Sequence, residues 1–120
     1  MNVEDVRNYC LSKQDVTEGF PFDDTTLVFK VKGKMFALLS LDQNRLNVKC
    51  NPEKAVELRE HYQSVVPAFH MNKKHWNTVM LNGDAGSGTI KKWIDDSYVL
   101  VVKKLDKKNR ERLLKNIVSS

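Results

Sequence analysis

The sequence has few of the residues that cross-link a small protein or hold a metal. Its 120 residues include only two cysteines, Cys10 and Cys50, which lie far apart in the chain. Two cysteines do not make a disulfide framework, and these two lack the close spacing of a CxxC redox or zinc motif. We expect both thiols to be buried, because a free cysteine behaves as a small hydrophobic side chain.

The sequence also lacks a long apolar run. Its N-terminal segment carries Glu4 and Asp5 among apolar residues, whereas a secretion signal needs a basic start followed by an unbroken apolar stretch. We therefore expect a cytoplasmic protein that does not enter a membrane.

No catalytic or cofactor-binding signature is present. The chain has no HExxH, no GxSxG and no Cys–His pair in a recognised order. His70 and His75 lie five positions apart, off the i, i+4 spacing that places two metal ligands on one helix face. The glycine-rich segment 82–88 is not followed by Gly-Lys-Ser/Thr, so it is not a phosphate-binding loop of known type. We expect a protein that is not an enzyme and that holds no metal and no cofactor.

What the sequence does contain is the pattern of one α+β domain over residues 1–120. Branched and alternating residues predict a hairpin and two more strands, which together form an antiparallel meander with one face in water. The predicted strands are 26–31, 34–41, 45–50 and 76–81.

Apolar residues at helical spacing predict four helices packed against that sheet. Asn2 caps the first, Asn51 and Pro52 start the second, and Asp106 caps the last. Either Asp84 or Ser87 should cap the long third helix, which runs to about residue 105.

The segment Phe20-Pro21-Phe22 should form a bend, because the proline forbids a helix. Both rings are large enough to anchor the bend to the core. We favour that role over stacking on a ligand.

Positive charge is concentrated near the C-terminus. The chain has 20 Lys and Arg against 15 Asp and Glu, a net charge of +5, and residues 103–115 contain seven basic residues but only Asp106 and Glu111 as acids. Such a cluster either contacts an anionic partner or keeps a helix face solvated, and the sequence leaves both open. The auxiliary binding candidates in this helix are Lys107, Lys108 and Arg112.

A second basic segment runs from His70 to Val79, where two histidines, two lysines, two asparagines and a tryptophan replace the usual turn residues. Lysine supplies phosphate affinity, Asn and His bind base edges or phosphates, and Trp offers a stacking face. For Trp76 we favour core packing over stacking. The tip of the predicted hairpin adds Lys30, Lys32 and Lys34, which strand alternation places on one face.

Several segments are distinctive together. They are Phe20-Pro21-Phe22, Gly33-Lys34-Met35-Phe36-Ala37, Lys49-Cys50 with Pro52-Glu53, His70-Met71-Asn72-Lys73-Lys74-His75-Trp76-Asn77-Thr78-Val79, and Ser97-Tyr98. They resemble the MmcQ/YjbR family of small bacterial proteins over nearly the whole chain. The resemblance implies a CyaY-like α+β fold, described as double-wing, and a DNA-binding role that is itself a prediction for the family. Asp23-Asp24 departs from the family pattern, and the chain lacks the acidic helix ridge that frataxin-like iron binding needs.

Carried over by this resemblance, the DNA-binding role falls on the loop, with the hairpin lysines as a second wing. We expect a monomer that binds double-stranded DNA. The alternative is a module that binds another protein or a small ligand and no nucleic acid. The candidate nucleic-acid-binding residues are His70, Lys73, Lys74, His75, Asn77, Lys32 and Lys34.

Overall fold

The computed structural model describes residues 1–68 and 71–119, and within them the chain forms one six-stranded antiparallel sheet with four helices. The strand order is β1-β2-β3-β4-β6-β5, so a meander of four strands is followed by β6, which is inserted between β4 and β5. The predicted α+β class is confirmed. The strands are β1 (Val16–Gly19), β2 (Thr26–Val31), β3 (Lys34–Ser40), β4 (Arg45–Lys49), β5 (Val65–Pro67) and β6 (Trp76–Met80).

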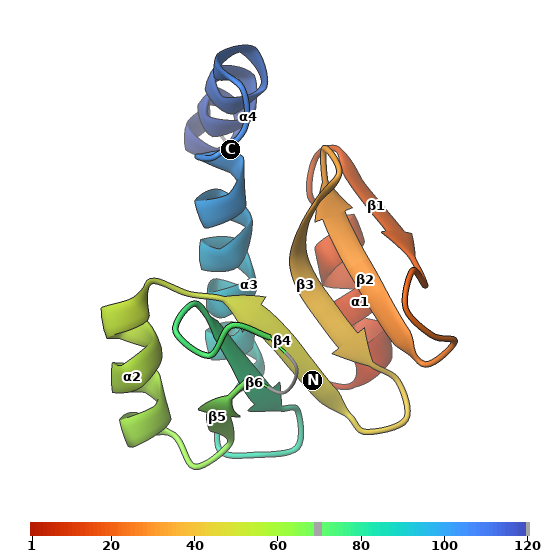
Figure 1. Cartoon of the computed structure of the whole chain (residues 1–120), viewed down its shortest axis with the longest axis vertical. Helices are drawn as coiled ribbons and strands as arrows, with labels where there is room; N and C mark the ends of the chain where they lie inside the picture. Colours follow the sequence, from red (N-terminus) through yellow and green to blue (C-terminus); the bar gives the residue numbers. More distant parts are fainter. Residues whose placement is uncertain (69–70, 120) are drawn as a thin grey trace.

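The helices cover one face of the sheet and leave the other open (Figure 1). Helices α1 and α3 lie behind the sheet, α2 lies beside β4 to β6, and α4 extends past the end of α3. We call the uncovered face the outer face. The helices are α1 (Val3–Leu11), α2 (Pro52–His61), α3 (Ser87–Val102) and α4 (Lys107–Ser119).

Three of the four predicted helix starts are confirmed. The backbone N–H of Asp5 donates to Asn2 Oδ1 at 2.8 Å, that of Glu53 to Asn51 Oδ1 at 3.1 Å, and that of Asn109 to Asp106 Oδ1 at 3.3 Å. Each bond satisfies an N–H that has no partner inside the helix.

The predicted cap of α3 is wrong. Gly86 occupies the N-cap position and provides no side-chain bond. Asp84 is used elsewhere: its carboxylate accepts the backbone N–H groups of Gln63 and Ser64, both at 3.0 Å. This carboxylate ties the start of β5 to the connection between β6 and α3.

The main core lies between the sheet and α1 and α3. Phe36 contributes a fully buried ring that meets Tyr98 edge to face, with centroids 5.4 Å apart. Ser97 on α3 donates to the Phe36 carbonyl at 2.6 Å and accepts the N–H of Lys49 at 2.8 Å, so one hydroxyl joins α3 to β3 and β4. Cys10 is fully buried, as expected, and burial raises its pKa to about 12.

A second, smaller apolar cluster lies on the outer face, where the sequence predicts water. It covers the centre of that face and contains Val28, Leu38, Ala68 and Trp76, with Met35 and Met71 packed against it. Trp76 is 8% exposed, so its structural role is confirmed, although it packs in this cluster and not in the main core.

The prediction that Phe20 and Phe22 anchor a bend to the core is wrong. They are 50% and 64% exposed. The physical reason is β1, a four-residue edge strand that local alternation does not reveal: the segment after it places Phe22 over the outer face, where the ring lines two open hollows and does not enter the main core. Asp23 holds the turn instead, because its Oδ1 accepts the backbone N–H of Thr25 at 3.0 Å and that of Thr26 at 2.7 Å.

Two further expectations concern the thiols and the membrane. Cys50 is only partly buried, unlike Cys10, and burial raises its pKa. No helix within residues 1–68 and 71–119 has the length and apolar character to cross a membrane.

Candidate nucleic-acid interface

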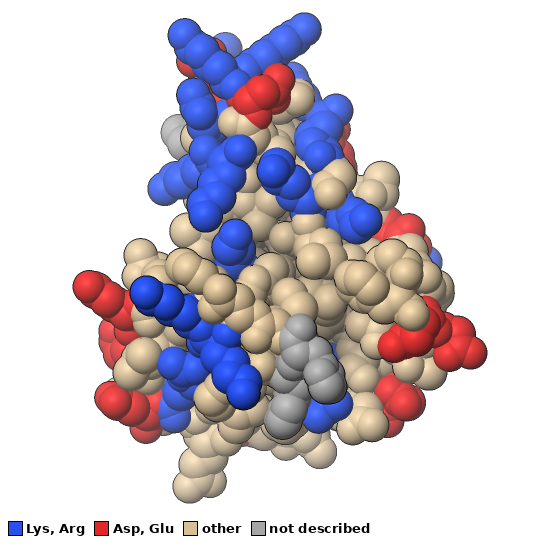
Figure 2. Space-filling view, viewed as in Figure 1, with Lys and Arg blue, Asp and Glu red and all other residues tan. Residues whose placement is uncertain are grey.

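The outer face carries most of its charge as separate patches of one sign. Figure 2 shows this face, with Lys and Arg side chains gathered over α4, beside the tip of the β2–β3 hairpin and near the connection between β5 and β6. Asp and Glu side chains gather at the two flanks of the view. A polyanion approaching this face would therefore meet positive charge along its middle and upper part.

The loop before β6 presents two of the predicted lysines. Lys73 and Lys74 are both exposed. The backbone that carries them is held in place: Lys74 N–H donates to Asn72 Oδ1 at 2.9 Å, and Arg59 Nη1 donates to the Lys73 carbonyl at 3.1 Å. His75 is partly buried, and its carbonyl accepts the N–H of Cys50 at 2.7 Å. The loop is thus a fixed turn whose two ammonium groups reach solvent.

Asn77 does not belong to this surface, and its predicted DNA contact is wrong. The residue is 1% exposed, and its Nδ2 donates to the Ala55 carbonyl of α2 at 3.2 Å. Alternation along β6 explains the difference, because Trp76 points to the outer face and its neighbour points to the opposite side. His70, also predicted in this site, lies outside the described residues.

The hairpin turn separates its lysines. Lys32 and Gly33 have φ values of 50° and 81°, the left-handed pair that a two-residue hairpin turn requires. Lys32 Nζ lies 3.6 Å from Asp15 Oδ2, whereas Lys30 and Lys34 line a hollow on the outer face. The prediction that all three share one face is therefore wrong for Lys32.

Arg112 is bound to the same carboxylate. Its Nη2 contacts Asp15 Oδ2 at 2.5 Å and Asn109 Oδ1 at 3.0 Å. The hydrogen bond from Arg112 is the main reason why the pKa of Asp15 is lowered. Arg112 therefore holds α4 to the turn before β1, while Lys107 and Lys108 at the start of α4 are exposed.

The structure brings together four lysines that are scattered in the sequence. A hollow of about 500 Å³ opens between the hairpin, β4 and the end of α3, and we call it the lysine hollow. Lys49 and Trp76 are direct partners in the β4–β6 ladder, so their side chains stand together on one face. Partial burial lowers the pKa of Lys49, and the nearby Lys104 and Lys34 lower it further. The hollow is lined by Phe22, Lys30, Gly33, Lys34, Met35, Lys49, Trp76, Val101 and Lys104.

Alternation along residues 45–50 places Lys49 on the outward side of its strand, but nothing in the sequence connects it with Lys104. The alternation of β4 was the only sequence signal for the position of Lys49. It does not reveal that the segment directly after α3, which carries Lys104, lies beside the same strand.

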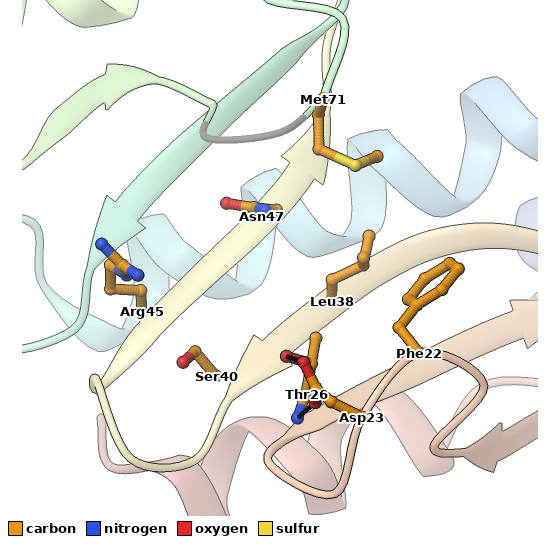
Figure 3. Close-up of a pocket in the computed structure, with 8 residues that line it drawn as sticks. All are labelled: Phe22, Asp23, Thr26, Leu38, Ser40, Arg45, Asn47 and Met71. Carbon is orange, nitrogen blue, oxygen red and sulfur yellow. Dashed lines mark hydrogen bonds between the residues drawn. The ribbon is translucent and has the colours of Figure 1, made fainter.

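A second hollow of about 390 Å³ lies on the outer face beside the first, and we call it the central hollow (Figure 3). Phe22, Leu38 and Met71 provide its apolar walls, and the Phe22 ring also lines the lysine hollow. Polar groups surround them, among them Asn47, whose Oδ1 accepts the Thr78 hydroxyl at 2.5 Å. The two hollows share one exposed aromatic ring.

In the described part of the chain, no three His, Cys, Asp or Glu side chains gather so that they could hold a metal ion. The lysine hollow is instead lined by lysines, two aromatic rings and apolar side chains, and the central hollow adds Asp23, Arg45 and uncharged polar groups.

The fold and this face define a small α+β protein, with helices on one side of an antiparallel sheet and a basic, hollowed surface on the other. The family model described as YjbR matches residues 11–100, and the chain belongs to the YjbR family. It is 31% identical over 116 residues to the uncharacterized protein YjbR of Escherichia coli K12, covering 95% of this chain and 98% of that protein. It is 35% identical over 96 residues to the uncharacterized protein YbdF of Escherichia coli O157:H7, covering 78% and 79%.

Solved structures show the same arrangement. Protein DR2400 of Deinococcus radiodurans is 42% identical, with a TM-score of 0.87 over 93% of this chain and 87% of that one. A crystallised protein from Pseudomonas syringae is 31% identical, with a TM-score of 0.73 over 83% of this chain and 98% of that one. The predicted family and its α+β fold are confirmed.

Proposed function

We propose that this protein binds double-stranded DNA through its basic outer face and does no chemistry on it. The observation that carries the proposal is the set of unpaired lysines on this face. Lys30, Lys34, Lys49 and Lys104 line one hollow, and none of them makes an ion pair with another described residue. Lysines without protein partners are available to neutralise phosphates.

The dimensions of the molecule support the same proposal. Its principal extents are 38 × 32 × 25 Å, and one turn of B-DNA is about 34 Å long. Lys and Arg side chains gather over α4, beside the β2–β3 hairpin and near the connection between β5 and β6 on the same face (Figure 2). We expect them to contact phosphates spread over about one helical turn.

This composition favours binding with little sequence preference. Ammonium groups contact the backbone, which positions a protein but carries no direct sequence information. Asn77, a residue that would read a base edge, is buried under α2. We therefore expect similar affinities for duplexes of unrelated sequence.

The test is a titration of a labelled duplex of about 20 base pairs at several salt concentrations. Six phosphate contacts, from the four hollow lysines with Lys73 and Lys74, would give a log–log salt slope of about −5. Affinity that does not change with salt, or no binding at low salt, would refute the proposal.

A second candidate function has its own support. Phe20 and Phe22 both expose their rings, and Phe22 lines the central hollow; exposed aromatic residues are enriched where proteins bind partners. A module for another protein or a small ligand would therefore use this end of the outer face. Binding of that kind would change little with salt, which separates it from duplex binding.

A further inference from the structure

The lysine hollow has an excess of positive charge that the protein itself does not balance. Its lining includes four lysines and no carboxylate. In contrast, Lys13, Lys32, Lys54 and Lys92 each lie within ion-pair distance of an Asp or Glu. The hollow therefore differs from these four lysines, and it gathers four lysines without a carboxylate partner in one concave site.

The ammonium groups in the hollow are close enough to affect one another. Lys49 stands partly buried on β4, and both Lys104 and Lys34 lower its pKa. Keeping three positive charges near each other costs free energy, which a bound anion would recover. A dianion would recover more than a chloride ion.

The remaining walls of the hollow are apolar or aromatic. Met35, Trp76 and Val101 form part of the lining, and the Phe22 ring stands at the boundary with the central hollow, 64% exposed. A flat organic group lying against Phe22 would hold its charged end toward the lysines. The volume of about 500 Å³ is in the range of ordinary small-ligand sites.

We infer that the lysine hollow binds a phosphate monoester attached to an aromatic group, with the phosphate among Lys34, Lys49 and Lys104 and the ring against Phe22. A nucleoside monophosphate has this chemistry. The phosphate could belong to a free nucleotide or to the 5′-phosphorylated end of a nucleic acid. The inference goes beyond duplex binding, because a backbone phosphodiester carries one negative charge and no free end.

The test uses the full chain labelled with ¹⁵N, titrated in chloride buffer without DNA. Adenosine monophosphate should give saturable shifts at the amides of Gly33, Lys49 and Lys104 and at the Trp76 indole. Inorganic phosphate should shift the same signals with at least fivefold weaker affinity, and adenosine should not saturate. Equal shifts with adenosine and its monophosphate would overturn the inference.

Matched variants separate a site from general positive charge. The double variant Lys49→Met, Lys104→Met should weaken adenosine monophosphate at least tenfold. The control Lys91→Met, Lys92→Met removes the same charge from α3, at residues that do not line the hollow, and should change affinity less than twofold. Phe22→Ala should remove the preference for adenosine monophosphate over inorganic phosphate. Equal losses in the two double variants would overturn the site.

Two further arms identify the source of the phosphate. If a 5′-phosphorylated oligonucleotide binds more tightly than the same strand without the phosphate, and the advantage is lost in Lys49→Met, Lys104→Met, the ligand is a nucleic-acid end. If the two strands bind equally while adenosine monophosphate still saturates the hollow, the ligand is a free nucleotide. If duplex binding depends steeply on salt but adenosine monophosphate causes no response, the proposed function is supported and the inferred phosphate site is wrong.

Discussion

Adjacent residues of β6 have opposite roles. Trp76 packs on the outer face with Val28 and Leu38, while Asn77 points to α2 and donates to the Ala55 carbonyl. From the local sequence alone, either side chain could contact a ligand. The orientation of the strand determines which of the two faces the outer side. The residues of this segment that reach the outer face are therefore those of the turn and Trp76, whereas Asn77 is held on the opposite side.

Replacing Trp76 with alanine should cost about 3 to 5 kcal/mol of unfolding free energy, because it leaves a cavity in a well-packed cluster. Urea unfolding at neutral pH measures the loss. Phe22→Ala is the control on the same face, and because that ring is 64% exposed it should cost less than about 0.5 kcal/mol. A Trp76→Ala protein that unfolds like the parent but no longer binds ligand would show that the ring is a stacking surface.

Removing a positive charge from the lysine hollow should stabilise the protein. Lys49→Met should raise the melting temperature by about 1 to 3 °C in chloride buffer, because it relieves partial burial of a charge and repulsion by Lys104 and Lys34. Lys92→Met is the control, since it removes a lysine paired with Asp96 at 3.2 Å and should bring no gain. A lower melting temperature for Lys49→Met would mean that packing of its aliphatic stem dominates.

At the scale of elements, the turn before β6 and the first turn of α4 present lysines from fixed backbones. Asn72 and Arg59 hold the turn, and Asp15 holds α4 through Arg112. Neither segment has to become ordered when it binds, so the entropic cost of a phosphate contact is low.

The double variant Lys73→Ala, Lys74→Ala should weaken duplex binding and make the log–log salt slope less steep by about two. Its melting temperature should stay within about 1 °C of the parent, because both side chains are exposed and the turn is held by backbone bonds and Asn72. Parallel titrations at four salt concentrations give the slope. An unchanged slope would remove this turn from the interface.

Reversing charge at the start of α4 tests the helix without breaking its attachment. Lys107→Glu with Lys108→Glu should lower duplex affinity more than tenfold at low salt, with recovery as salt screens the repulsion over a Debye length of about 10 Å at 0.1 M. Arg112 stays intact because it binds Asp15. The matched reversal Lys91→Glu, Lys92→Glu on α3 should have a clearly smaller effect. Equal effects would mean that only net charge matters.

Much of this framework could be predicted from local signals. Alternation predicts β2, β3, β4 and β6, and cap residues mark the starts of α1, α2 and α4. The four residues of β1 and three of β5 are too few for alternation to stand out. Without β1, the sequence also places Phe20 and Phe22 in the core, whereas the segment after this strand leaves both rings exposed.

The candidate site was less predictable, because its chemistry depends on distant neighbours. Asp15 takes up the charge of Lys32 and Arg112, which come from opposite ends of the chain. Lys49 and Lys104 meet only after α3 has packed against β4. Spacing in the sequence contains no signal for either event.

At the scale of the whole molecule, opposite pKa shifts predict how stability depends on pH. Hydrogen bonds from Arg112, from Arg7 and from the backbone of Thr25 lower the pKa values of Asp15, Glu18 and Asp23 respectively. When the pH falls to the ordinary carboxyl pKa values of 3.8 to 4.5, the unfolded chain therefore binds more protons than the folded one. The stability these carboxylates contribute is complete above that range and is lost as pH falls through their folded pKa values.

The midpoint of urea unfolding should thus stay level from pH 7 to about pH 5 and decline below about pH 4. Above about pH 9 the raised pKa values of Cys10 and Cys50 act in the opposite sense: the unfolded chain releases these thiol protons first, so stability falls as pH rises, and the lowered pKa of Lys49 offsets only part of this loss. Asp15→Asn should reduce the acid-side decline relative to the parent. A decline of the same size in Asp15→Asn would show that this carboxylate does not contribute.

The two outermost strands have a consequence for how copies of the protein behave when crowded together. An open sheet edge is a template onto which a strand of a second molecule can add, and natural proteins guard against this with short strands and prolines. Here β1 offers four residues and is followed by Pro21, and β5 offers three and ends on Pro67. Neither edge offers the long, flat ladder that templated aggregation requires, so we expect concentrated solutions to resist fibre formation.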